Sequence, residues 1–421
     1  MTVDAHRSVE VIWRIEAPRL IASLTRLVRD VGLAEQLAQD AFVLALEQWP
    51  ERGVPDNPGG WLMSTAKHKA IDLIRRERAR DEKYAQLAAG LDPAGADTAP
   101  EPDAVGDDLL SLVFMTCHPV LPPESRVALT LRLLGGLTTD EIARAFLVPS
   151  PTVGQRISRA KRTLAESRVP FEVPGSDELP ERVTAVLEVV YLVFNEGYAA
   201  TSGDAWVRRD LAAEAMRLGR VLTGLLPREP EVHGLVALME LQASRFAART
   251  GPDGEPVLLA DQDRRRWDRT LINHGLRALD RAIALRRPLG PYTLQAAIAA
   301  CHARATEFAA TDWEAIVALY DALAQIAPSP VIDLNRAVAV MYADGPAAGL
   351  DALEPLRGDP RLARYHLLGA VRGEALERLG RHAEAATELE QAAALAPTQR
   401  ERRLLRTRAA ALRPRLSAES P

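Results

Sequence analysis

Apolar residues recur at three- and four-residue intervals along most of the chain, which is the spacing of amphipathic helices. The stretch GGWLMSTAKHKAIDLIRRERAR, residues 59–80, is an example. One side of this helix is apolar and carries Leu62, Met63, Ala66, Ala70, Leu73 and Ile74. The opposite side carries polar and mostly basic residues: Ser64, Thr65, Lys67, His68, Lys69, Asp72, Arg75, Arg76 and Arg78. A solvated surface would explain such a face on one helix, so its role depends on the rest of the chain.

A second helix is expected just before the basic one, over residues 32–49. Its apolar positions have helical spacing, and Phe42 and Leu46 are expected to face the core. It should end in PERGVPDNPGG, residues 50–60, because proline and glycine oppose helix continuation. Residues 1–85 are therefore predicted to form one small helical domain.

The stretch LTTDEIARAFLVPSPTVGQRISRAKRTL, residues 137–164, predicts two short helices joined by a tight turn. Thr139 and Ser150 are expected to cap the first and second helix, with Pro151 opening the second. In the second helix one face is apolar and consists of Val153, Ile157, Ala160 and Leu164. The outer face is polar and consists of Thr152, Gln155, Arg156, Arg159 and Arg162. This pattern is typical of a DNA-binding helix-turn-helix, and an ordinary αα-hairpin is the alternative.

The C-terminal part carries an internal repeat. In residues 366–397, small residues and a closing proline occupy the positions that a tetratricopeptide repeat reserves for them, at Gly373, Ala385, Ala392 and Pro397. A similar unit ends at Pro328, about two repeat periods earlier. The pattern predicts an α-solenoid, and solenoids usually bind other proteins.

Composition supports an all-α fold. The chain has 421 residues, of which 47% are hydrophobic, 26% charged and only 5% aromatic, and helix formers dominate. Two cysteines cannot form a disulfide framework or a multi-cysteine zinc site. Neither a signal peptide nor an apolar run of membrane-spanning length is present in the sequence. We therefore expect a soluble cytoplasmic protein.

The net charge of −5 is unevenly distributed. Residues 61–85 hold seven Lys and Arg against four Asp and Glu, whereas residues 86–108 hold six acids and no base. Residues 86–106 are also rich in Ala, Pro and Gly, so we expect a flexible acidic linker. The predicted domains are 1–85, a helix-turn-helix domain over 107–170 and a helical-repeat domain over 177–415.

These segments together resemble a known family. AEQLAQDAFVLALEQW (34–49), the basic helix and the helix-turn-helix resemble regions 2.2, 2.3–2.4 and 4.2 of sigma-70-family RNA polymerase sigma factors. With the helical extension and VVYLVFNEGY (189–198), the chain resembles the extracytoplasmic-function subgroup that has a tetratricopeptide-like extension. The resemblance implies a transcription initiation factor that directs core RNA polymerase to promoters, acting in the cytoplasm at the nucleoid.

The resemblance also assigns roles to the faces found above. The basic helix would contact the −10 element through Ser64, Lys67, His68, Lys69, Asp72, Arg75, Arg76 and Arg78. The second helix of the helix-turn-helix would contact the −35 region through Thr152, Gln155, Arg156, Arg159 and Arg162. Gln155, Arg156 and Arg159 would read base edges and Thr152 would contact phosphates, whereas Arg162, Lys161 and Arg168 would add general electrostatic attraction. Trp61 is interpreted as a core residue, with a base-stacking wedge as the alternative.

Two partner surfaces of the polymerase are implied, the β′ clamp helices and the β flap. The clamp helices would contact the expected exposed side of helix 32–49, which consists of Glu35, Gln36, Gln39 and Asp40. Promoter DNA is the other partner, and a separate regulator protein is a further candidate. No membrane partner and no cofactor are expected.

The extension is expected to regulate the sigma domains in cis. Its candidate contact or organising residues lie in FNEGY (194–198) and DQDRRRWD (261–268): Asn195, Glu196, Tyr198, Asp261, Asp263 and Trp267. Helix capping and interhelix hydrogen bonding are the alternative roles of these residues. An enzyme is disfavoured, because His233, His274 and His302 have no metal-ligand spacing and no HExxH, GxSxG or Walker motif occurs. An ordinary helix-turn-helix regulator with a sensing solenoid is the alternative function.

Overall fold

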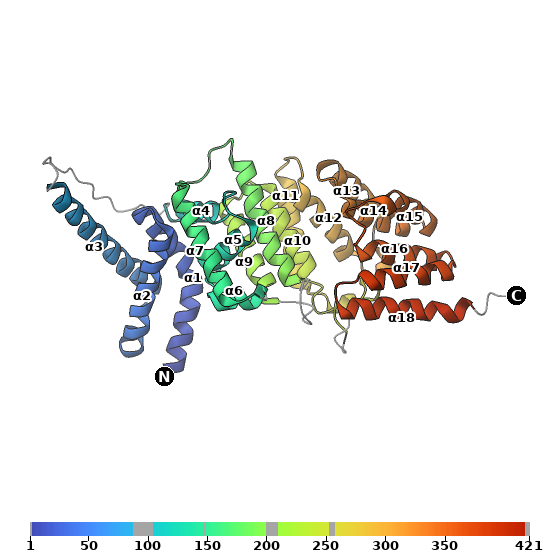
Figure 1. Ribbon diagram of the computed structural model, residues 1–421, viewed down its shortest axis with the longest axis horizontal. Helices are drawn as coiled ribbons and strands as arrows, with labels where there is room; N and C mark the ends of the chain where they lie inside the picture. The colour runs from blue at the N-terminus through green and yellow to red at the C-terminus, as the bar shows by residue number, and fades with distance from the viewer. Residues whose placement is uncertain (1, 87–103, 147, 199–208, 252–256, 417–421) are drawn as a thin grey trace. The chain divides into compact units, whose positions relative to one another are not determined.

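The computed structural model describes residues 2–86, 104–146, 148–198, 209–251 and 257–416, and helices build the architecture throughout these ranges (Figure 1). The predicted all-α fold is confirmed. The chain divides into two compact units, residues 1–193 and 194–421. Most of the expected acidic linker, residues 87–103, lies outside the described residues. No helix of the described part combines the length and apolar character needed to cross a membrane.

The first unit begins with three long helices, α1 (Thr2–Val28), α2 (Val31–Arg52) and α3 (Pro58–Gln86), which pack on one another. The side chain of Asp30 starts α2 by accepting a hydrogen bond from the backbone N–H of Leu33, at 2.8 Å. α2 ends within residues 50–60, as expected, although it continues through Pro50 to Arg52. A proline this close to a helix end forfeits only one backbone hydrogen bond. Gly53 then ends the helix with φ +83°, a conformation that glycine adopts without strain.

The core of these three helices includes much of the apolar faces that the sequence predicted for α2 and α3, although Met63, Leu73 and Ile74 are only half-buried. Its buried members include Leu20, Ile21 and Leu24 of α1 and Leu37, Phe42, Leu62, Ala66 and Ala70 of α2 and α3. Leu46 is an exception. The sequence predicts that it faces the core, but 37% of its surface is exposed.

The next four helices are α4 (Ala104–Thr116), α5 (Pro123–Leu133), α6 (Thr139–Phe146) and α7 (Ser150–Glu166). Helices α6 and α7 form the predicted helix-turn-helix, and Val153, Ile157, Ala160 and Leu164 are buried as expected. α7 packs on α5 as well as on α6. The same first unit includes the first residues of α8 (Leu179–Tyr198), where Arg182 donates a hydrogen bond to the carbonyl of Phe114 at 2.8 Å.

Both helix caps expected in the helix-turn-helix were wrong. Thr138, one residue before Thr139, caps α6: its hydroxyl accepts from the backbone N–H of Glu141 at 3.1 Å, and the Glu141 carboxylate accepts from the backbone N–H of Thr138 at 2.8 Å. The Ser150 hydroxyl does not cap α7, because it donates to the carboxylate of Asp140 in α6. That hydrogen bond ties the two helices together.

The second unit is a succession of helices, in order α9 (Arg209–Leu225), α10 (Pro230–Ala243), α11 (Arg269–Ala284), α12 (Pro291–Arg304), α13 (Trp313–Ile326), α14 (Pro330–Ala343), α15 (Pro346–Leu353), α16 (His366–Arg378), α17 (His382–Leu395) and α18 (Gln399–Leu416). From α12 onward each helix packs on the next (Figure 1). Separate apolar clusters follow one another, centred for example on Leu323, Leu353 and Leu389. Such local cores are typical of a solenoid, and the predicted α-solenoid is confirmed.

The small residues of the repeat lie where two helices approach closely. A Cβ atom at Gly373 in α16 would come within 2.8 Å of the Leu389 side chain in α17. Ala385 and Ala392 of α17 are fully buried. Close helix packing therefore explains the repeat signature.

Candidate nucleic-acid and polymerase interface

The outer face of α7 presents unpaired donors to solvent. Gln155, Arg159 and Arg162 are exposed, and Thr152 and Arg156 are half-buried. Within the described part of the chain, no carboxylate lies within 4.0 Å of the guanidinium groups of Arg156, Arg159 and Arg162. A basic face on the second helix of a helix-turn-helix, with its guanidinium groups free, suits phosphates and base edges.

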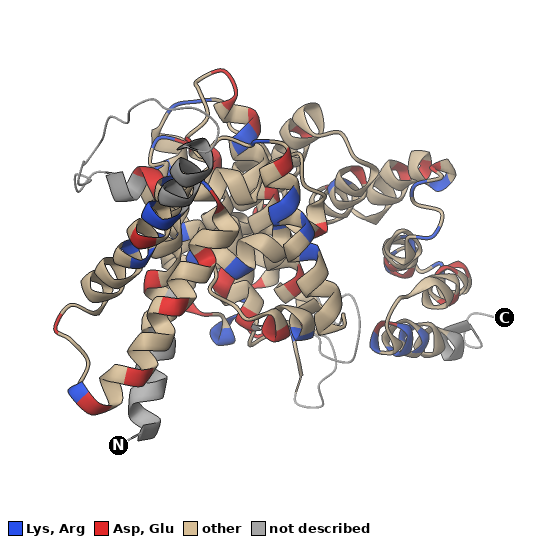
Figure 2. Ribbon diagram, turned by 60° about the vertical axis from the view of Figure 1, so that its left-hand side comes forward, with Lys and Arg blue, Asp and Glu red and all other residues tan. Residues whose placement is uncertain are grey.

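The basic face of α3 is arranged as expected. Ser64, His68, Asp72, Arg75 and Arg76 are exposed, and Lys67 and Lys69 are half-buried. Figure 2 colours the Lys and Arg positions along the ribbon. The Nζ atom of Lys69 lies 3.9 Å from a carboxylate oxygen of Asp40 in α2, and both side chains stay partly exposed. Arg78 lies in α3, but its side chain is outside the described residues. The face thus holds several cations in contact with solvent, which suits a polyanion.

Trp61, at the start of α3, is half-buried. Its ring packs edge-on against the buried ring of Trp49 at the end of α2, with 5.5 Å between the centroids. This contact favours a packing role over a free stacking surface.

The expected exposure of Glu35 was wrong. Its side chain is 6% exposed and lies between two cations of the helix-turn-helix segment. The Nε–H of Arg132 in α5 donates to Glu35 Oε1 at 2.7 Å, and the ammonium group of Lys161 in α7 donates to Oε2. Gln39, the half-buried residue one turn later, also donates to Glu35 Oε1, at 2.8 Å. Of the predicted polymerase-binding residues, Gln36 is exposed and Asp40 is partly exposed.

A second buried carboxylate joins the same two segments. Asp108 of α4 accepts a hydrogen bond from the Ser23 hydroxyl of α1 at 3.4 Å and lies 3.3 Å from the Nε atom of Arg26. Burial raises the pKa of this carboxyl above its ordinary value, although Arg26 and Ser23 act in the opposite direction. Asp108 and Glu35 together hold α4–α7 against α1 and α2, and we call this the closed arrangement.

Sequence patterns gave no signal for the closed arrangement. Glu35 and Lys161 are 126 residues apart, and Ser23 and Asp108 are 85 apart. Each residue has an unremarkable local setting, so only the packing of the helices brings the charges together. Covariation between such positions is a signal that one sequence lacks.

In the second unit the candidate regulatory residues are mostly organised within their own surroundings. The Tyr198 hydroxyl donates to Gln242 at 3.0 Å and accepts from Arg245 at 2.9 Å. Trp267 is buried, with the Arg264 guanidinium 4.8 Å from its ring centroid. Asp263 caps a short 3-10 helix, Arg264–Arg266. Asn195 and Glu196 are half-buried and Asp261 is exposed. Capping and interhelix contacts thus account for several of these residues.

The histidines weighed as enzyme candidates each have a structural setting. His233 is buried with its Nε2 atom 3.0 Å from the Pro227 carbonyl, and His274 contacts the fully buried Glu240 at 2.7 Å. Burial, with Arg245 and Arg264 nearby, lowers the pKa of His302 to about 3. Among the described residues, no cluster of three His, Cys, Asp or Glu could hold a metal ion.

Both N-terminal segments match known protein families. Residues 12–80 match the family described as "Sigma-70 region 2", and residues 111–164 match "Sigma-70, region 4". Residues 182–283, at the start of the extension, match a "Family of unknown function (DUF6596)".

Similar proteins point to the same family. An uncharacterised protein of Rhizobium meliloti is 45% identical over 382 residues, covering 90% of this chain and 90% of the relative. The "Probable ECF RNA polymerase sigma factor SigI" of Mycobacterium tuberculosis is 30% identical over 173 residues, covering 41% of this chain and 59% of that protein. The "ECF RNA polymerase sigma factor SigK" of Mycobacterium bovis is 28% identical over 151 residues, covering 35% and 78%. The chain therefore belongs to the extracytoplasmic-function group of sigma-70-family RNA polymerase sigma factors, and it carries a helical C-terminal extension.

Proposed function

We propose that α3 reads the −10 element and α7 reads the −35 element, and that the helical extension controls in cis whether they reach DNA. The observation that carries this proposal is the outer face of α7, where Gln155 and Arg159 are exposed and no carboxylate of the described residues neutralises the arginine. The protein would act without catalysis, at the nucleoid.

The closed arrangement does not fit simultaneous reading of both elements. By their names the −10 and −35 elements are about 25 base pairs apart, which is about 85 Å at 3.4 Å per base pair. Lys161 of α7 contacts Glu35, which lies about 7.5 Å of helix before Asp40. Asp40 in turn lies 3.9 Å from Lys69 of α3. The two reading helices are thus far closer than the two elements, so we propose that the closed arrangement is a resting form that opens on promoters.

Polymerase docking on the β′ clamp helices is proposed for the exposed positions of α2. Gln36 and Asp40 remain available there, whereas Glu35 and Gln39 are engaged in the closed arrangement. The double variant Gln36→Lys with Asp40→Lys should abolish binding to core polymerase and leave the fold intact. Glu188→Lys, an exposed change in α8 outside both proposed polymerase contacts, is the matched control, and wild-type core affinity in the double variant would exclude this surface. The β flap would contact the α4–α7 segment.

The extension is proposed to be regulatory because a solenoid offers extended binding surfaces. The test compares run-off transcription by core polymerase with the full chain and with residues 1–193, the whole first compact unit. A higher transcript yield from the fragment indicates an inhibitory extension, and a lower yield indicates a positioning role. Equal yield and equal salt dependence would refute regulation in cis.

The same assay addresses the other candidate function. An ordinary helix-turn-helix regulator would give no specific transcript with core polymerase alone. It would also leave the match of residues 12–80 to sigma region 2 without explanation.

A further inference from the structure

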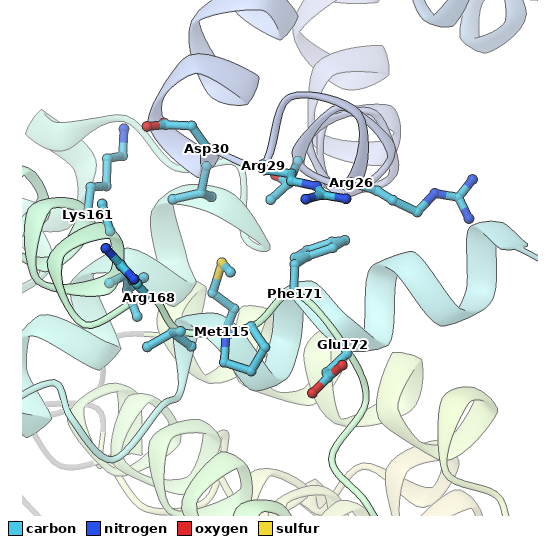
Figure 3. A pocket seen from close by; sticks show the side chains of 14 residues that line it. Arg26, Arg29, Asp30, Met115, Lys161, Arg168, Phe171 and Glu172 are labelled. Atoms are coloured by element: carbon cyan, nitrogen blue, oxygen red, sulfur yellow. The ribbon is translucent and has the colours of Figure 1, made fainter. Parts of the chain in front are cut away.

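A cavity of about 750 Å³ lies where the two sigma segments meet in the closed arrangement (Figure 3). Its walls come from the ends of α1 and α7, the start of α2 and the segment 169–172. Four of the lining residues are apolar, namely Met115, Leu164, Val169 and Phe171. Four others are cationic, namely Arg26, Arg29, Lys161 and Arg168. The volume and the mixture of apolar and polar groups are typical of a small-molecule site.

Two of the four cationic side chains form no ion pair with the described residues. Arg26 and Lys161 hold Asp108 and Glu35. By contrast, among the described residues no carboxylate lies within 4.0 Å of the guanidinium of Arg29 or Arg168, and both residues are exposed. Their guanidinium groups can therefore donate to a ligand.

Arg29 and Arg168 also share an unusual backbone. They follow α1 and α7 with φ values of +55° and +49°, in the left-handed region where glycine is the usual residue after a helix. The helix dipole does not explain an arginine with this backbone. A cation near a helix C-terminus interacts favourably with the dipole, but an arginine in the last turn of the helix makes the same interaction without backbone strain. Strained residues cluster at functional sites, so two of them on one cavity point to a use for their side chains.

The chemistry of the walls selects the kind of ligand. Paired guanidinium groups bind phosphates through parallel N–H donors. The half-buried ring of Phe171 offers a surface on which an aromatic body can stack, and Met115 also lines the cavity. Two carboxylates, those of Asp30 and Glu172, also line the cavity and can accept from amino groups. We propose that this cavity binds an organic phosphate with an aromatic body, its phosphates held by Arg29 and Arg168.

Binding would be coupled to the closed arrangement. Arg29 and Asp30 belong to the region 2 segment, whereas Met115 and Arg168 belong to the region 4 segment and the chain that follows it. A ligand that needs both walls binds only the closed arrangement, and a ligand at one hundred times its Kd would favour closure about a hundredfold. An inhibitory effect on transcription rests on the function proposed above, whereas binding and closure do not.

Calorimetry on the full chain tests the site with ADP and inorganic pyrophosphate as probes and adenosine as the uncharged comparison. We expect ADP to bind more tightly than pyrophosphate, and adenosine not to bind. Arg29→Gly and Arg168→Gly should each weaken ADP binding at least tenfold, and glycine relieves the strain so that thermal stability is kept. Arg286→Gly is the matched control, because Arg286 has φ +51° in the other compact unit and does not line the cavity.

Fluorescence energy transfer measures closure independently of transcription. Donor and acceptor dyes are placed at Glu51→Cys in α2 and Ser158→Cys in α7, both exposed, in a Cys301→Ser background where the remaining Cys117 is buried. ADP should raise the transfer efficiency in the wild-type cavity and not in Arg168→Gly.

The proposal is overturned if neither ADP nor pyrophosphate binds at millimolar concentration, or if the two cavity variants bind ADP as tightly as Arg286→Gly does. Binding without any change in transfer efficiency overturns the coupling to closure.

Discussion

The substitution Glu35→Gln should open the closed arrangement. Glu35 is a buried charge between the two sigma segments, and its carboxylate contacts Arg132 and Lys161 of the other segment. Glutamine has nearly the same shape and keeps an oxygen that can accept a hydrogen bond. It removes the negative charge, so the two cations are left facing each other across a neutral group.

The size of the effect follows from burial. Removing one partner of a buried ion pair typically costs about 3–5 kcal/mol. Here the side chains of Arg132 and Lys161 are 19% and 23% exposed, so water can recover part of the lost interaction. We therefore expect closure to weaken by about 2 kcal/mol, which is roughly a thirtyfold shift toward the open arrangement.

The labelled pair at positions 51 and 158 reports this shift as a loss of transfer efficiency. Glu47→Gln is the matched control, because it makes the same chemical change at an exposed position of α2 and should alter closure less than twofold. Equal transfer efficiency in the Glu35 and Glu47 variants would refute the reasoning. In that case the ion pairs would be surface features that do not hold the segments together.

Three further predictions follow from the same structure. Gln155→Ala should change the preferred −35 sequence. Arg162→Ala should instead weaken binding about equally on all sequences and lower the slope of log binding constant against log salt concentration by about one. An unchanged sequence preference in the Gln155 variant would show that α7 is oriented differently. Because burial lowers the pKa of His302 to about 3, the stability that its neutral ring provides is complete above pH 6.5 and is lost as the pH falls from 6.5 to 3. His302→Phe should therefore flatten the acid side of the stability curve by up to about 5 kcal/mol, and parallel unfolding curves between pH 4 and 7 would contradict this. Gly234→Ala should destabilise the second unit by about 2 kcal/mol or more, because a Cβ there would lie 2.8 Å from the backbone of α12, whereas Gly224→Ala, with open space around it, should stabilise the chain slightly in the same thermal melt.

Periodicity determined the helical class of the fold and the positions of several helices. Apolar spacing predicted α2, α3, α6 and α7 and identified the residues that α7 buries. It could do so because a helix repeats every 3.6 residues, so the local sequence decides which of its faces is buried and which is exposed to solvent. The small residues of the repeat, such as Gly373, were also evident, since close helix packing excludes larger side chains. The order of the basic helix and the helix-turn-helix was enough to indicate the family.

Local chemistry was less reliable where several polar groups compete. Thr138 and Thr139 both suit a cap, and backbone geometry selects the first. Ser150 has the residue type of a cap, but the carboxylate of Asp140, brought close by the turn, takes its hydroxyl. Which of several possible hydrogen bonds forms depends on distances of a few tenths of an ångström, and a sequence pattern does not contain them.

Only the tertiary structure decided what Glu35 does. The sequence predicts that Glu35 lies with Gln36 on a solvent-exposed helix face. Folding instead places it against Arg132 and Lys161, about a hundred residues further along the chain. The cavity that Arg29 and Arg168 line likewise exists only after the ends of α1 and α7 have come together. Helical periodicity records what each residue meets within its own helix. The partners of a buried charge are set by how helices distant in sequence pack, because that packing alone decides which cations surround it when water is excluded.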